Sequence, residues 1–143
     1  MRCASESMPS NLKRFTATSR NGWAVRIIVV GLGIQGHKRR ASAGDDFVAT
    51  VDPINDAADY KAVEDVPLGD YDAALVCTPD ESKENLLEYL LSNAKHVLVE
   101  KPLFAPRDGI LERLGQLARD HGVICYTAYN HRFEPHFIRL KEV

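Results

Sequence analysis

The sequence predicts an α/β protein with a doubly wound parallel sheet, and two observations lead to that prediction. Short apolar runs alternate with stretches of helical period along most of the 143 residues. Several of these runs are continuous rather than alternating, as expected for strands that are buried on both faces of a sheet. Strands that alternate with helices in this way form a parallel sheet with right-handed crossover connections.

The first half of the chain contains two clear strands. Ala24 to Val30 is apolar apart from one arginine, and it leads into a glycine-rich turn and a short helix that extends to about Ala43. Phe47 to Val51 is the second strand. The segment from Ile54 to Asp72 is short for the helix and strand that usually stand at this point, and Tyr60 to Val63 is expected to form a brief edge strand.

The second half repeats the alternation of strands and helices. Ala73 to Cys77 and His96 to Val99 are apolar strands, and each precedes a stretch with apolar residues at helical spacing. Gly122 suits the position just beyond the second of these helices, and Val123 to Ala128 is the last strand. A final helix is expected from Pro135 to Val143. The expected buried helix faces comprise Leu86, Leu87, Leu90 and Leu91 in one helix and Ile110, Leu111, Leu114, Leu117 and Ala118 in the other.

The composition is that of an ordinary globular domain, with 45% hydrophobic and 27% charged residues. A net charge of -2 gives no reason to expect nucleic acid or an anionic membrane as a partner. The apolar runs are too short to cross a bilayer, and the basic first residues precede no apolar signal segment. The cysteines Cys3, Cys77 and Cys125 form no metal-binding or disulfide pattern, so no metal site is expected and a reducing cytoplasm fits best.

Residues 1–22 are rich in Ser, Arg, Asn and Thr and show no apolar period. We interpret them as a disordered tail, with an organelle-targeting role as the alternative. Residues 23–143 are then expected to form one domain.

A glycine motif follows the first strand. Gly31 to Gly36 matches G-x-G-x-x-G and opens a helix, which is the context that dinucleotide binding requires. Gly31 permits the tight turn, Gly33 lets the backbone approach a pyrophosphate, and Gly36 lets helix and strand pack closely. The free N–H groups of Ile34, Gln35 and Gly36 would hold the phosphates at the helix start. The motif predicts a Rossmann-type fold.

Asp52 ends the second strand, about 20 residues beyond the first glycine, where a carboxylate can accept a hydrogen bond from a ribose hydroxyl. Its negative charge should repel a 2′-phosphate, so NAD is the expected cofactor and NADP the less favoured one. The alternative interpretation is that Asp52 and Pro53 only initiate a turn. The basic residues from His37 to Arg40 are expected to form a solvated helix face rather than to bind phosphate.

Polar residues also follow the later strands, at Thr78-Pro79, at Glu100-Lys101-Pro102 and around Asn130. In open parallel sheets, ligands bind outside the carboxyl ends of the strands, so these residues are expected to border one crevice. With the glycine motif and Asp52, they appear in an order that resembles the N-terminal half of the glucose–fructose oxidoreductase / inositol dehydrogenase (Gfo/Idh/MocA) family. The most specific element is the run from Lys95 to Leu103.

The resemblance implies hydride transfer between a sugar-type carbinol and a nicotinamide, with Lys101 as the catalytic residue beside the reacting hydroxyl. It implies that Thr78, Pro79, Glu100, Lys101 and Asn130 join the glycine motif and Asp52 in binding the cofactor. A cis bond between Lys101 and Pro102 is expected. Because Glu100 would otherwise face Lys101, its side chain is expected to turn into the structure and bond to backbone.

Two departures from the family pattern stand out. Lys83 occupies a position where many members carry a histidine, and the second helix is abbreviated. The larger difference is that the family's antiparallel-sheet substrate domain is not expected within these residues, with residues 129–143 as the exit toward it. Two hypotheses remain open. The chain is the cofactor half of a dehydrogenase for a sugar, polyol or nucleotide sugar, inactive alone and able to form homo-oligomers; alternatively, it is a non-catalytic NAD(H)-binding module, alone or paired with a partner chain.

Overall fold

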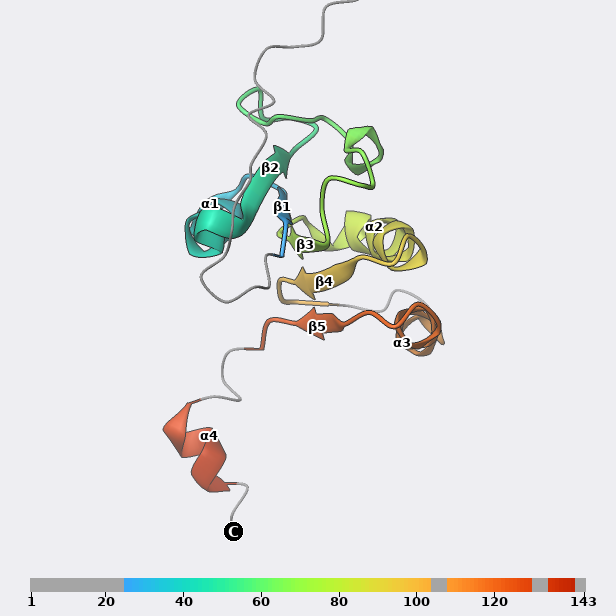
Figure 1. Cartoon of the computed structure of the whole chain (residues 1–143). Coiled ribbons are helices and arrows are strands. Elements are labelled where there is room, and N and C mark those ends of the chain that lie inside the picture. Colours follow the sequence, from blue (N-terminus) through green and yellow to red (C-terminus); the bar gives the residue numbers. More distant parts are fainter. Residues whose placement is uncertain (1–24, 104–107, 130–133, 141–143) are drawn as a thin grey trace, which may run out of the picture.

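A computed structural model describes residues 25–103, 108–129 and 134–140 of the chain. Within these residues, five parallel strands form one sheet in the order β2-β1-β3-β4-β5 (Figure 1). This order, in which the chain first extends the sheet on one side of β1 and then on the other, confirms the doubly wound α/β prediction. The strands are β1 (Ile27–Val30), β2 (Phe47–Val51), β3 (Ala73–Val76), β4 (His96–Val99) and β5 (Cys125–Thr127).

The helices cover the two faces of the sheet unequally. Right-handed crossovers place a helix on one face when the chain moves in one direction along the sheet and on the other face when it reverses. Accordingly, α1 lies on one face, whereas α2 and α3 lie together on the other (Figure 1). The helices are α1 (Ile34–Ala43), α2 (Asp80–Ser92), α3 (Ile110–Asp120) and α4 (Pro135–Leu140), with single 3-10 turns η1 (Gly44–Asp46) and η2 (Val63–Asp65).

The bounds of β2 and β4 agree with the sequence prediction, and β1, β3 and β5 are shorter than predicted. The predicted edge strand from Tyr60 to Val63 is wrong. Tyr60 makes an isolated parallel bridge with Val51, and a 3-10 turn begins at Val63. The segment is held beside β2 partly by a side chain, because the backbone N–H and hydroxyl of Thr50 both donate to the Asp59 carboxylate.

The core lies between the sheet and the α2/α3 layer. Three of the four leucines predicted to face inward from α2 are fully buried, and the fourth is packed against them. Leu111, predicted to share the inner face of α3, is 47% exposed because the buried stripe runs through Leu114 and Ala118 instead. Its largest fully buried side chains are Tyr71, Ile28, Leu87, Leu90 and Leu91.

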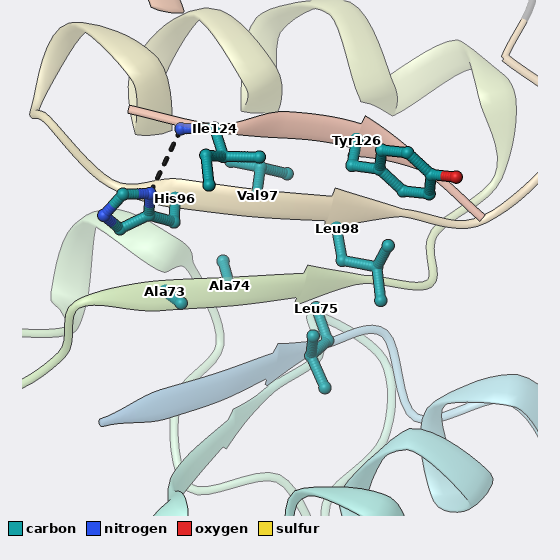
Figure 2. Close-up of a pocket in the computed structure, with 8 residues that line it drawn as sticks. All are labelled: Ala73, Ala74, Leu75, His96, Val97, Leu98, Ile124 and Tyr126. Atoms are coloured by element: carbon teal, nitrogen blue, oxygen red, sulfur yellow. Dashed lines mark hydrogen bonds between the residues drawn. The ribbon is translucent and has the colours of Figure 1, made fainter. Parts of the chain in front are cut away.

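The opposite face of β3, β4 and β5 is left partly uncovered, because α1 packs on β1 and β3. A shallow apolar hollow lies on this face, and Figure 2 shows Leu75, Leu98 and Tyr126 projecting along it from three neighbouring strands. At its far end, the backbone N–H of Ile124 donates to Nδ1 of His96. Ile124 is 65% exposed.

Candidate cofactor site at the carboxyl edge of the sheet

The carboxyl ends of all five strands lie in one register. Val30 pairs with Val51 on one side and Val76 on the other, and Val76 and Val99 continue the row toward β5. In four of the five strands, the residue after the strand extends this row, because its backbone N–H donates to the neighbouring strand of the sheet. Gly31 N donates to Val51 O (2.8 Å), Cys77 N to Val30 O (2.7 Å), Glu100 N to Val76 O (2.8 Å) and Ala128 N to Val99 O (2.9 Å). The glycine turn, Asp52, Thr78 and Lys101 therefore lie along one edge.

Two glycines of the motif are required by the fold itself. Gly31 has φ +93°, and a Cβ there would stand 2.8 Å from the carbonyl oxygen of Cys77. At Gly36 a Cβ would stand 1.8 Å from the carbonyl oxygen of Gly31, so a side chain there would force α1 away from the turn. These contacts agree with the tight-turn and close-packing roles predicted for the two residues.

Gly33 differs from both. It has φ -72°, and a Cβ at this position would meet nothing within 4 Å. The fold therefore imposes no steric need for glycine here, and the open space adjoins the start of α1. Such space is what close approach of a pyrophosphate requires.

The first turn of α1 is exposed at Gly33, Ile34 and Gln35. Among the described residues, no side chain caps this helix start, and its first turn carries no acidic residue. The N–H groups at a helix start carry a partial positive charge and need acceptors. The turn is consequently available to an anionic ligand.

Asp52 is bonded to the glycine turn. Its Oδ2 accepts the backbone N–H of Leu32 (2.7 Å), and its Oδ1 accepts those of Ile54 and Asn55 (2.9 Å each). Partial burial opposes the charged form, but these N–H groups, with Lys61, outweigh it and hold the pKa of Asp52 below its ordinary value. Asp52 is thus a carboxylate at neutral pH, placed beside Gly31–Gly36 as predicted. The alternative turn-initiating role is also present, since the residue caps the turn after β2.

Thr78 carries a buried polar atom without a partner. Its Oγ1 is inaccessible to solvent and has no hydrogen-bond partner among the described residues. A Cβ at Gly31 would stand 3.2 Å from the backbone nitrogen of Thr78, so this residue adjoins the glycine turn. Pro79 follows as the N-cap residue of α2. A polar ligand is one way to satisfy such a hydroxyl, and with the open space at Gly33 and the free start of α1, it fits a dinucleotide cofactor.

Glu100 departs from the prediction that it bonds to backbone. Its carboxylate instead accepts hydrogen bonds from the guanidinium of Arg39, which reaches across from α1. Arg39 was predicted to lie on a solvated face, and this too is wrong, because its side chain is only 26% exposed. His37, Lys38 and Arg40 are exposed as predicted. The reason for the difference is the tertiary position of α1, from which the Arg39 side chain reaches the residue that follows β4.

The structure places Lys101 at the same edge as the glycine turn, with its side chain exposed. The bond between Lys101 and Pro102 is cis, as expected. Lys83, a departure from the family pattern in the sequence, proves to be a buried side chain whose ammonium contacts this same segment. Its contacts could not be read from the sequence, because they join α2 to a strand end 17 residues away. Asn130 lies outside the described residues.

Further predictions concern the cysteines, metal binding and membrane spans. Cys77 and Cys125 are half-buried free thiols, and burial raises the pKa of Cys77 to about 11 and also raises that of Cys125. Within the described residues, no cluster of three or more His, Cys, Asp and Glu side chains could hold a metal ion. None of the described helices has the length and apolarity needed to cross a membrane.

The family model described as "Oxidoreductase family, NAD-binding Rossmann fold" matches residues 37–129. This chain belongs to the Gfo/Idh/MocA family. The match begins just beyond the glycine motif, so the geometry at Gly31–Gly36 is independent support for a nucleotide-binding Rossmann domain. It extends across Asp52, Thr78 and Lys101.

Relatives of known name agree with this assignment. The chain is 29% identical over 118 residues to inositol 2-dehydrogenase 1 of Saccharopolyspora erythraea, covering 81% of this chain and 32% of that protein. Its fold resembles UDP-N-acetylglucosamine 3-dehydrogenase from Acidithiobacillus ferrooxidans (TM-score 0.72, 18% identity, covering 82% of this chain and 42% of the other). It also resembles scyllo-inositol dehydrogenase from Lactobacillus casei, solved with NAD(H) and scyllo-inositol bound (TM-score 0.68, 22% identity, 84% and 40% covered). The chain thus spans about one third to two fifths of these proteins.

Proposed function

We propose that this chain is the cofactor-binding domain of an NAD-dependent dehydrogenase that acts on a hydroxyl of a sugar, polyol or nucleotide sugar. The observation that carries the proposal is the register of the strand ends, which brings the glycine turn, Asp52 and Lys101 to one edge of the sheet. The family provides the reaction type. Relatives named as inositol and UDP-N-acetylglucosamine dehydrogenases support the substrate class.

Each element of the edge has a role in the proposal. The backbone N–H groups of Ile34, Gln35 and Gly36 bind the pyrophosphate over the open space at Gly33. Asp52 accepts a hydrogen bond from the adenosine ribose, and Thr78 and Pro79 border the cofactor further along the edge. Bound nicotinamide supplies the hydride acceptor.

Asp52 supports NAD over NADP. Both of its carboxylate oxygens already accept backbone N–H groups, so the charge is fixed in place beside the turn. A 2′-phosphate would bring further negative charge close to this carboxylate, and like charges at short range repel strongly. The shortened connection after β2 leaves the adenosine side open, so we expect NAD to bind weakly to the chain alone.

Lys101 is the proposed acid–base group. Hydride leaves a carbinol carbon only when its hydroxyl also loses a proton, so a proton acceptor must stand within hydrogen-bond reach. The exposed side chain of Lys101 can accept that proton as an amine and return it as an ammonium. Glu100 does not compete for this lysine, because Arg39 holds its carboxylate.

The proposal also covers the substrate, the cellular location and self-association. We expect a small sugar-type substrate as the partner of the complete site, and we place the protein in the cytoplasm, where the free thiols of Cys77 and Cys125 remain reduced. The partly uncovered sheet face in Figure 2 supports self-association as a homo-oligomer.

The test uses Lys101→Ala in the dehydrogenase that contains this domain, assayed with inositols and UDP-N-acetylglucosamine. Turnover should fall by about a hundredfold or more, the scale for losing a positioned acid–base group. The NAD dissociation constant should change little, because the glycine turn and Asp52 carry binding. Full turnover by the variant would refute the assigned role of Lys101, and wild-type protein that binds no NAD would refute the proposed function.

A further inference from the structure

Lys83 is a charged side chain in the interior, only 2% exposed. A buried ammonium is costly unless it is paired and its donors are satisfied. Its Nζ donates to Oδ1 of Asp80 (2.6 Å), to the carbonyl oxygen of Glu100 (2.8 Å) and to that of Pro102. An ammonium has three N–H donors, so all three are used.

The two backbone acceptors stand on either side of Lys101. One ammonium on α2 thereby bonds to the carbonyl groups of both Glu100 and Pro102, the residues before and after Lys101. From the other face of the sheet, Arg39 on α1 holds the Glu100 side chain. Helices α1 and α2 lie on opposite faces (Figure 1), so the segment is fixed from both.

We propose that Lys83 is a positioning residue for Lys101: its buried ammonium fixes the backbone path from Glu100 to Pro102 and so fixes where the Lys101 side chain leaves the sheet edge. The catalytic consequence rests on the proposed function, whereas the positioning itself does not. A lysine suits the task because three donors converge from one flexible stem. A histidine at this position offers at most two N–H donors and could not hold all three acceptors.

The chain contains a matched control. Lys95 also uses its ammonium to tie two backbone carbonyls, those of Leu68 (2.6 Å) and Tyr71 (2.8 Å). It precedes β4, whereas Lys101 follows it, so this second clamp lies at the opposite end of the strand. Lys95→Met removes the same kind of contact without touching the carboxyl edge.

The first measurement is hydrogen exchange by mass spectrometry on the chain with Lys83→Met or Lys95→Met. With Lys83→Met, amide exchange across Glu100–Leu103 should accelerate by at least about tenfold, because local opening sets these rates. With Lys95→Met, acceleration should be confined to the segments around Leu68 and Tyr71. Lys83→Gln, which retains two N–H donors, serves if the methionine variant does not fold, and it should give an intermediate acceleration.

The second measurement is steady-state kinetics in the dehydrogenase that contains this domain. A displaced Lys101 should lower kcat by on the order of tenfold to a hundredfold in Lys83→Met, as small misplacements of catalytic groups do. The KM for NAD should stay unchanged, and Lys95→Met should keep kcat within about twofold of wild type, the scale of a change that does not reach the reacting groups. Lys83→Gln should restore part of kcat.

Unchanged exchange across Glu100–Leu103 in both Lys83 variants would overturn the proposal, as would equal kcat losses in Lys83→Met and Lys95→Met. Lack of activity in the wild-type dehydrogenase that contains this domain would count against the proposed function, and the exchange result alone would then decide whether Lys83 positions the segment.

Discussion

Gly33 and Gly36 separate binding from folding at the carboxyl edge. Gly33→Val adds a side chain where the structure has open space, at a φ of -72° that valine tolerates. Reduced freedom of the unfolded chain stabilises such a variant by about 0.4–1 kcal/mol. Loss of a favourable glycine at the helix N-cap opposes this by an amount of similar size, about 1 kcal/mol. The free energy of unfolding should therefore stay within about 1 kcal/mol of wild type.

Binding should respond differently. The added methyl groups occupy the space through which a pyrophosphate would approach the N–H groups of α1, so NAD affinity should fall by at least about tenfold, or ~1.4 kcal/mol. Gly36→Ala is the opposite case. Its Cβ would overlap the Gly31 carbonyl oxygen at 1.8 Å, and forced overpacking of this kind costs about 1–3 kcal/mol or more.

Gly69→Val is the matched control, since a Cβ there also meets nothing within 4 Å and the residue lies at the amino end of the sheet. Isothermal calorimetry with NAD and thermal unfolding of all four proteins provide the assay. We expect Gly69→Val to bind like wild type, Gly33→Val to fold but bind NAD at least about tenfold more weakly, and Gly36→Ala to melt at lower temperature. Wild-type affinity in Gly33→Val would refute the placement of the pyrophosphate at this turn.

Two further predictions follow from charge and exposure. The pKa of Asp52 is lower in the folded protein than its ordinary value of 3.8, so its stabilising contribution is complete above that value and is lost as the pH falls through the folded pKa. Urea unfolding should show Asp52→Asn less stable than wild type at pH 7, with the difference shrinking below about pH 4; a constant difference would show that the charge contributes nothing. Leu98→Glu places a charge on the uncovered face, and sedimentation of the chain should show less self-association than wild type. Equal self-association of the variant and the wild type would show that the contact between copies lies elsewhere on the chain.

The sequence predicts those features that depend on local pattern. Continuous apolar runs predicted β2 and β4 with their observed bounds, and G-x-G-x-x-G after a strand predicted the turn that the contacts of Gly31 and Gly36 require. The shared edge along which Asp52 and Lys101 lie also followed from the sequence, because carboxyl ends of parallel strands share one edge.

Features that depend on packing between distant segments were not predictable. Arg39 and Glu100 are 61 positions apart, and their pairing depends on the tertiary position of α1, from which the Arg39 side chain reaches the residue after β4. The same holds for Lys83, because two of its three acceptors are backbone carbonyls, which no residue type reveals. The pattern of apolar and polar residues could not reveal the uncovered sheet face either. Val97 and Leu98 are both apolar although their side chains lie on opposite faces of the sheet.

The central claim is that the carboxyl edge of the sheet binds NAD, and calorimetric titration of the wild-type chain with NAD and NADP tests it most directly. The account predicts measurable heat with NAD and a clearly weaker response with NADP, because Asp52 is ionised beside the turn. Absence of binding by NAD, or tighter binding by NADP, would contradict it.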